Sequence, residues 1–346
     1  MDKYQQRSFL LALLLCLPVL AVQAAAPALF EAEVVVSDQT PAQRSVALKS
    51  ALGEVLVRVT GQGSVLEAPA VQTLLAGPEQ LVQQYRYFTE PNQEPPLLKL
   101  WVRFDGDAIR QTLQQQGLAY WGGERPDTLV WLAVEDRGNR YLVSADDTSE
   151  VHREVAVAAR ARGVPVVFPL MDLEDQARVR YADIWGGFFD KVVSASQRYN
   201  PPAILIGRLN RMPSGGWASR WQLEMGGKTR SWSDSHPQLD VLAKQGIDDL
   251  ADVQASQLAI TTNTAGSTVV ISVTGINTLA AYARTNNYLA SLSSIRNLQV
   301  GEVKPGAVQY TLQLNGSMQD LTRTVAIGTV LTPAADGMPG TYLLRQ

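Results

Sequence analysis

The sequence has little of the residue types that carry most protein chemistry, with one cysteine and two histidines among 346 residues. The cysteine, Cys16, lies in an apolar stretch near the N-terminus, so the rest of the chain has no thiol nucleophile and no internal disulfide. The histidines, His152 and His236, each lack the second histidine one helical turn away that a zinc hydrolase requires. We therefore expect no metal centre and no cofactor, and we assign both histidines to a helix start or a loop.

The motifs of the common hydrolases and nucleotide-binding proteins are also missing. The chain has no Gly-x-Ser-x-Gly elbow, and no serine precedes a lysine by three positions. Residues 226–229, Gly-Gly-Lys-Thr, are similar to the end of a phosphate-binding loop, but Gln222 stands where that loop has its first glycine. Because predicted strands flank this segment, we predict a hairpin turn at Gly226 and Gly227.

Basic residues form no tract, and the formal net charge is −3. A nucleic-acid partner is therefore not expected, because such partners are bound by a concentrated positive surface. Hydrophobic residues make up 46% of the chain and charged residues 18%, a balance typical of folded proteins. The length then predicts more than one domain.

The N-terminal segment has the layout of a secretory signal peptide. Lys3 and Arg7 precede an apolar run over 9–22, and small residues follow it. The run is about 14 residues long, shorter than the roughly 17 to 25 that a membrane-spanning helix needs. We predict a signal peptide over 1–24, cleavage near Ala24 and Ala25, a periplasmic mature protein, and no transmembrane segment after cleavage.

Two segments are predicted to be joints between domains. Residues 119–126 combine paired glycines with a proline, and residues 261–266 are small and polar. The predicted fold class is α/β and α+β, with three small domains after the signal peptide. They are an amino-terminal α+β domain over 25–122, a central α/β domain over 123–262 and a ferredoxin-like carboxy-terminal domain over 263–346.

In the first domain, a helix is predicted to begin after Thr40 and to end at Gly61. Thr40 suits the N-cap, Pro41 suits the first helical position, and Gln43 stands where a capping box has an amide or an acid. Apolar residues then recur at helical spacing as far as Val59. The remaining predicted elements of this domain are strands at 30–36, 84–88 and 98–104 and a helix at 107–116.

The central and last domains are predicted from the order of their elements. In the centre, strands and helices alternate up to residue 209, which implies crossover helices and a mixed sheet with some parallel pairing. The predicted central elements are strands at 128–134, 140–144, 164–168 and 203–209, helices at 149–162 and 188–199, two strands joined at Gly226 and Gly227, and a helix at 239–259. The last domain has the order βαββαβ, which is ferredoxin-like and hosts many unrelated activities.

Three tryptophans and several acidic clusters are candidates for a site. Trp217, Trp221 and Trp232 on two adjacent strands either form an exposed binding face or pack under the long helix that follows. The acids could supply a catalytic pair, but they fall at predicted turns, helix starts and solvated helix faces, where aspartate caps and solubilises. We assign no catalytic, cofactor-binding or metal-binding residue. The acidic clusters are Asp105 and Asp107; Asp146 and Asp147; Asp172, Glu174 and Asp175; and Asp248, Asp249 and Asp252.

Four separated segments carry a resemblance to a known family. Residues 30–36 (Phe-Glu-Ala-Glu-Val-Val-Val), 56–61, 98–104 and 203–208 together resemble the secreted bacterial family catalogued as domain of unknown function number two thousand and sixty-six. That family has no established activity, so no functional residue follows from the resemblance. Residues 198–208 are also similar to the α/β domain of the Tol–Pal translocation protein, the curli secretion lipoprotein and the activators of penicillin-binding proteins. The first domain is similar to the amino-terminal domain of a flagellar basal-body ring protein, and these likenesses imply a binding module.

We therefore expect an exported periplasmic protein of the bacterial envelope that is not an enzyme and acts as a binding or scaffold module. Its expected partner is an envelope protein or a cell-wall component, bound through a strand edge or the aromatic surface of the central domain. Two alternatives stay open. A cell-wall hydrolase would place two carboxylates across a cleft, and a carrier of small ligands would have a large apolar pocket between domains.

Overall fold

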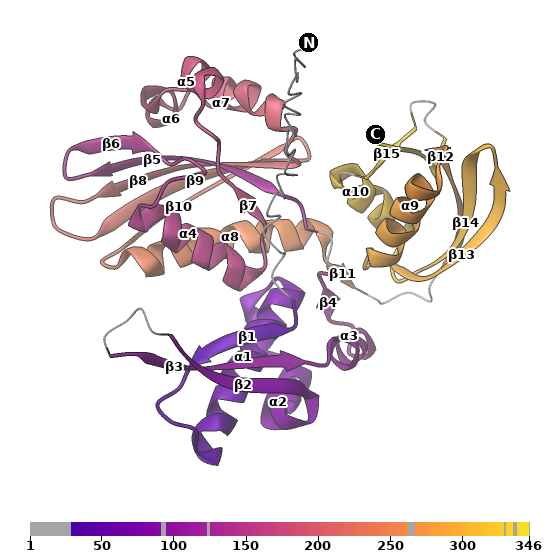
Figure 1. Cartoon of the computed structure of the whole chain (residues 1–346), viewed down its shortest axis with the longest axis horizontal. Coiled ribbons are helices and arrows are strands. Elements are labelled where there is room, and N and C mark those ends of the chain that lie inside the picture. Colours follow the sequence, from indigo (N-terminus) through magenta and orange to yellow (C-terminus); the bar gives the residue numbers. More distant parts are fainter. Residues whose placement is uncertain are drawn as a thin grey trace, which may run out of the picture.

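The computed structural model describes residues 29–90, 95–122, 125–261, 267–328, 330–334 and 338–345. The predicted signal peptide and most of the predicted joint at 261–266 lie outside these residues. Figure 1 shows three main sheets that follow one another along the chain, each with its own helices and its own hydrophobic core. Among the described helices, none has both the length and the hydropathy that crossing a membrane requires. We call the three parts the N-terminal, central and C-terminal units; the exact domain boundaries stay a prediction.

The N-terminal unit is an antiparallel three-stranded sheet with the order β1-β3-β2, covered on one face by α1. The predicted helix is confirmed as α1, which begins at Pro41 and is followed by its C-cap, Gly61, with φ of 75°. At its start, the hydroxyl of the N-cap residue Thr40 accepts a hydrogen bond from the Gln43 amide. Short helices between α1 and β2 were not predicted from the sequence. The elements of this unit are β1 (Glu31–Val35), α1 (Pro41–Thr60), a 3₁₀ helix (Gly63–Glu67), α2 (Pro69–Ala76), a second 3₁₀ helix (Pro78–Leu81), β2 (Val82–Glu90), β3 (Leu97–Phe104), α3 (Gly106–Gln115) and β4 (Ala119–Tyr120).

The central unit has a mixed sheet with the order β10-β9-β8-β5-β6, and β7 pairs beside β5. The predicted crossover helices are confirmed, because β5 is parallel to both β7 and β8. Figure 1 shows α4 and α8 on the side of this sheet that faces the N-terminal unit, and α5, α6 and α7 on the opposite side. The elements are β5 (Thr128–Asp136), β6 (Asn139–Leu142), α4 (Glu150–Arg162), β7 (Val166–Val167), α5 (Leu173–Arg178), α6 (Tyr181–Gly186), α7 (Phe189–Ser196), a 3₁₀ helix (Gln197–Tyr199), β8 (Ala203–Arg211), β9 (Trp217–Met225), β10 (Lys228–His236) and α8 (Leu239–Leu258).

The C-terminal unit confirms the βαββαβ order, with β14 lying between β13 and β12 as in a ferredoxin-like sheet. Its end has one addition, because α10 is followed by a short antiparallel pair in which β15 forms the sheet edge and β16 pairs parallel to β12. The three-residue β15 ends in Pro333 and has too little pattern to be predicted. The elements are β12 (Thr268–Ile276), α9 (Leu279–Ser291), β13 (Ile295–Lys304), β14 (Gly306–Leu314), α10 (Met318–Ile327), β15 (Leu331–Pro333) and β16 (Thr341–Leu344).

The two predicted joints meet each other in the fold. β4 pairs antiparallel with β11 (Ile260–Thr261), so that Tyr120 lies opposite Ile260. The ends of the N-terminal unit and of α8 are therefore held together by a two-stranded ribbon just before the chain enters the C-terminal unit (Figure 1).

Candidate functional site

A cleft lies between the N-terminal and central units, where α1 faces α4 and α8. It has a volume of about 620 Å³, within the range of roughly 300 to 1,000 Å³ that is usual for ligand sites, which often form between domains. Apolar side chains form much of its walls, and charged ones lie among them. The lining consists of Val46, Lys49, Ser50, Gly53, Glu54 and Val57 of α1, Leu66 and Leu75 after it, Ala158, Ala161 and Arg162 of α4, and Lys244 and Asp248 of α8.

Gly53 opens the cleft from the middle of α1. Glycine inside a helix costs about 1 kcal/mol relative to alanine. No close approach requires it here, because a Cβ at this position would lie 3.8 Å from Leu66 Cδ2 and 4.0 Å from Leu75 Cδ2, which are ordinary contacts. Gly246 in α8 is the opposite case, since a Cβ there would overlap the indole of Trp221. Packing explains Gly246, whereas no close contact explains Gly53, which lines the cleft without a side chain.

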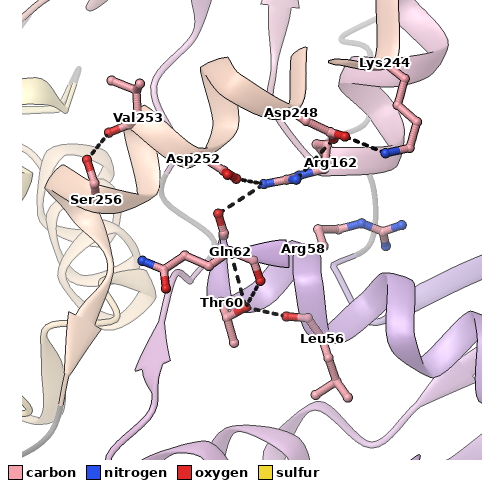
Figure 2. Close-up of polar contacts among 12 residues, drawn as sticks. Leu56, Arg58, Thr60, Gln62, Arg162, Lys244, Asp248, Asp252, Val253 and Ser256 are labelled. Carbon is pink, nitrogen blue, oxygen red and sulfur yellow. Dashed lines mark hydrogen bonds and ion pairs between the residues drawn. The ribbon is translucent and has the colours of Figure 1, made fainter. Parts of the chain in front are cut away.

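Arg162 lines the cleft and joins three elements, as the contacts in Figure 2 show. It is the last residue of α4, and its buried guanidinium donates to Asp248 Oδ1 at 3.1 Å and to Asp252 Oδ1 at 2.6 Å, both on α8. It also donates to the carbonyl of Gly61 at 3.1 Å, directly after α1. Lys244 adds an ion pair to Asp248 at 2.5 Å. One side chain thus fixes α1, α4 and α8 relative to each other.

Arg58 and Arg125 extend this junction through backbone carbonyls. Arg58 Nε donates to the Ala161 carbonyl at 2.7 Å, and its Nη1 donates to the Glu31 carbonyl at 2.5 Å. Arg125 donates to the carbonyls of Arg58 at 2.6 Å and Arg162 at 2.8 Å. Burial, more than the neighbouring positive charges, lowers the pKa of both Arg58 and Arg125. Because these guanidiniums are hydrogen-bonded within the protein, they hold the walls of the cleft in place without a ligand.

The cleft contains two carboxylates on opposite walls, Glu54 on α1 and Asp248 on α8. Burial raises the pKa of Glu54, and the nearby charges of Arg58 and Lys244 oppose that rise. Asp248 is held by Arg162 and Lys244. The cleft can therefore receive an apolar group between two carboxyl groups. The raised pKa of Glu54 favours its protonated form, and Asp248 is paired with two cations.

Comparison with known proteins finds a family model that is similar to the N-terminal part of the chain. Residues 24–122 match the model of a family described as a domain of unknown function (DUF8605). This segment includes α1, and so one wall of the cleft. No curated protein matches the chain.

The tryptophan face considered from the sequence is not a surface. Trp217 is 3% exposed and Trp221 is 1% exposed, and both belong to the core beneath α8. Trp232, which lies opposite Trp221 across β9 and β10, is half-buried and packs against the same core. The interpretation that these residues pack under the helix is confirmed, and the exposed aromatic face is wrong for Trp217 and Trp221. The alternation of β9 allowed either result, because it does not tell which face α8 covers.

The acidic clusters and histidines lie apart from one another. Asp105 caps α3, as predicted. Asp175 differs from its predicted solvated position, because it is fully buried and accepts hydrogen bonds from Arg198, the Tyr199 hydroxyl and the Met171 amide. Within the described residues, no group of three or more His, Cys, Asp or Glu could hold a metal ion. Of the other candidates, His152 lies beside Phe168 near the start of α4, and His236 is the last residue of β10. Asp248 and Asp252 form ion pairs with Arg162.

Sequence reasoning missed Gly53 and the three arginines of the junction. Gly53 interrupts an apolar helix pattern, and a glycine inside a helix is a signal that could have been followed. The arginines had no signal, because Arg58, Arg125 and Arg162 are distant in sequence and have ordinary neighbours.

Proposed function

We propose that the protein is an exported, non-catalytic binding protein of the bacterial envelope, and that its cleft receives the apolar part of an amphipathic envelope component. The cleft of about 620 Å³ with largely apolar walls is the observation that carries this proposal. Gly53 adds to it, because it lines the cleft without a side chain at a helix position where alanine would be about 1 kcal/mol more stable and would fit at ordinary contact distances.

The walls of the cleft fit such a ligand. Val46, Val57 and Leu66 offer apolar surface. Lys49 lies on the rim and forms no ion pair within the described part of the chain, so it is available to an anionic head group. The junction of Arg58, Arg125 and Arg162 makes the site rigid, which lowers the ordering cost of binding.

Export is part of the same proposal and is supported by the signal-peptide pattern of residues 1–24. The likeness to a secreted family and to envelope scaffold domains supports the same location. Protein recovered from the periplasmic fraction is expected to begin at Ala25 on N-terminal sequencing. An intact leader on a cytoplasmic product would contradict this location.

Binding can be tested with a dansyl-labelled undecanoic acid, titrated by fluorescence into the mature protein. Wild type is expected to bind saturably. Gly53→Leu, whose side chain extends into the cleft, is expected to lower the affinity at least about tenfold, the loss of roughly two buried methylenes. Gly53→Ala is the matched control and should stay within a few-fold of wild type, while its unfolding free energy rises by up to about 1 kcal/mol.

Two results of this titration would contradict the proposal. One is a wild-type protein that leaves the probe free. The other is a Gly53→Leu variant that is as stable as wild type and binds the probe equally well.

A second candidate, a cell-wall hydrolase with paired carboxylates, is favoured by one observation. Glu54 and Asp248 line the same cleft, and the pKa of Glu54 is raised as a general acid requires. The release of soluble fragments from purified peptidoglycan distinguishes the two functions. Turnover by wild type that is lost in both Glu54→Gln and Asp248→Asn would replace the binding function with the hydrolase. Probe binding without turnover supports the binding protein.

A further inference from the structure

A second concave surface lies on the other face of the central sheet. It has a volume of about 460 Å³ and is formed mainly by β8, β9 and β10 with Trp185 at its side. The helices on this face leave β9 and β10 largely uncovered, because α6 packs mainly on β5, β6 and β8 and α7 packs mainly on β8 (Figure 1). The outward residues of β9 and β10 are therefore open to solvent.

Strand register places two arginines side by side on this surface. Arg208 of β8 lies directly opposite Arg220 of β9, and Arg220 lies opposite Ser233 of β10. The next row on the same face contains Asn210 and Ser235. Like charges directly opposite each other in a sheet are destabilising by up to about 1 kcal/mol, so this row has a cost that the fold alone does not explain.

No acid within the described residues forms an ion pair with Arg208 or Arg220. Glu224 is on the same face of β9, but it lies about 13 Å along the strand from Arg220 and accepts hydrogen bonds from Gln222 and Thr229. Asp234 contributes to the rim of the surface. Its side chain, however, lies on the α8 face, where its charge helps to raise the pKa of Asp249.

The surroundings of Arg208 hold it in place without neutralising it. Its guanidinium carbon lies 5.0 Å from the centre of the Phe189 ring, and its buried Nε has no hydrogen-bond partner among the residues that the structure describes. Burial lowers the pKa of Arg208, and the charge of Arg220 lowers it further. An anion between the two guanidiniums would relieve both effects.

We propose that Arg208 and Arg220 bind the phosphoryl group of a phosphomonoester. Two guanidiniums on one concave surface bring two positive charges and several N–H donors, which match a dianion with three terminal oxygens, whereas one guanidinium already satisfies a carboxylate. Ser233, Ser235 and Asn210 line the same surface and add neutral donors. Trp185 forms a wall for the organic part of the ligand. The site lies across the sheet from the α1, α4 and α8 cleft and does not depend on the function proposed for that cleft.

Isothermal titration with phenyl phosphate tests this site in the mature protein. We expect phenyl phosphate to bind and phenol and benzoate to bind at least tenfold more weakly. Arg208→Ala and Arg220→Ala should each weaken phenyl phosphate binding by about 10- to 100-fold, the usual worth of a hydrogen bond to a charged group. Arg230→Ala is the matched control, because Arg230 is an exposed arginine on the opposite face of β10, and it should bind as wild type does.

The source of the phosphoryl group is decided by a parallel sedimentation assay with phosphatidylcholine vesicles that contain phosphatidic acid. Binding to the soluble probe assigns a free phosphomonoester, and binding to the vesicles alone assigns a lipid headgroup. In either case, the Arg208→Ala and Arg220→Ala variants must lose the observed binding. Absence of both interactions, or equal binding by wild type and the two arginine variants, would overturn the proposal. Gly53→Leu should bind phenyl phosphate normally, which separates this site from the cleft.

Discussion

Two groups of arginines in this protein have opposite surroundings. At the junction between the N-terminal and central units, Arg58, Arg125 and Arg162 direct their donors at backbone carbonyls and at two carboxylates. On the open face of the central sheet, Arg208 and Arg220 oppose each other, and no carboxylate in the described part of the chain pairs with either of them. The same residue type therefore serves structure where it binds carbonyls and carboxylates of the protein, and is available for recognition where no described carboxylate pairs with it.

The junction predicts the largest loss of stability. Arg162→Ala should lower the unfolding free energy of the protein by about 3 to 5 kcal/mol, because it removes three hydrogen bonds of a buried guanidinium, those to Asp248, Asp252 and the Gly61 carbonyl, two of which are made to charged groups. Urea unfolding followed by tryptophan fluorescence measures the change. Arg230→Ala is the control and should change stability by less than about 0.5 kcal/mol. Equal stability of the two variants would show that the junction is not what holds the units together.

The tight approach of α1 to α8 predicts the next effect. Gly61→Ala should destabilise by about 2 to 4 kcal/mol, since φ at this position is 75° and the new Cβ would overlap the Cβ of Ala255. Gly138→Ala is the matched control, because φ is 84° and no atom of the described residues lies within 4 Å of the new Cβ. It should lose only the backbone term of about 1 to 2 kcal/mol. The same urea series measures both variants, and equal losses would mean that the contact with Ala255 contributes nothing.

The open sheet face predicts the smallest effect, of opposite sign. Arg220→Ala should leave the unfolding free energy unchanged or raise it by up to about 1 kcal/mol, because it removes a like charge opposite Arg208. Chemical unfolding in low salt shows the gain most clearly, since salt screens the repulsion in the wild type. A loss of more than about 1 kcal/mol would make Arg220 a structural residue like those of the junction.

Much of the fold could be predicted because the signals are local. The limits of α1 followed from Thr40, Pro41 and Gly61, which act within one helical turn of the ends that they define. The order of elements in the central and C-terminal units followed from periodicity. The two six-residue helices α5 and α6 and the three-residue β15 were missed, because such short elements contain too few turns or alternations to show a period.

The candidate sites could not be predicted in the same way. A large apolar pocket between domains was expected only as the sign of a ligand carrier, and no pattern located it at Gly53. Arg208 and Arg220 are separated by a hairpin, so their opposition appears only once the register of β8 and β9 is known. The likeness to known families offered no residue to examine.

The sequence by itself determined the limits of the longer elements, such as α1, because caps, turns and apolar spacing act over a few neighbouring residues. Only the tertiary structure decided that Trp221 is core, that the two joints pair as β4 and β11, and that Arg162 links three helical segments. These contacts join residues far apart in the chain. They depend on which surfaces of the units pack together. Many side chains contribute to the free energy of that packing, so no single segment of the sequence reveals it.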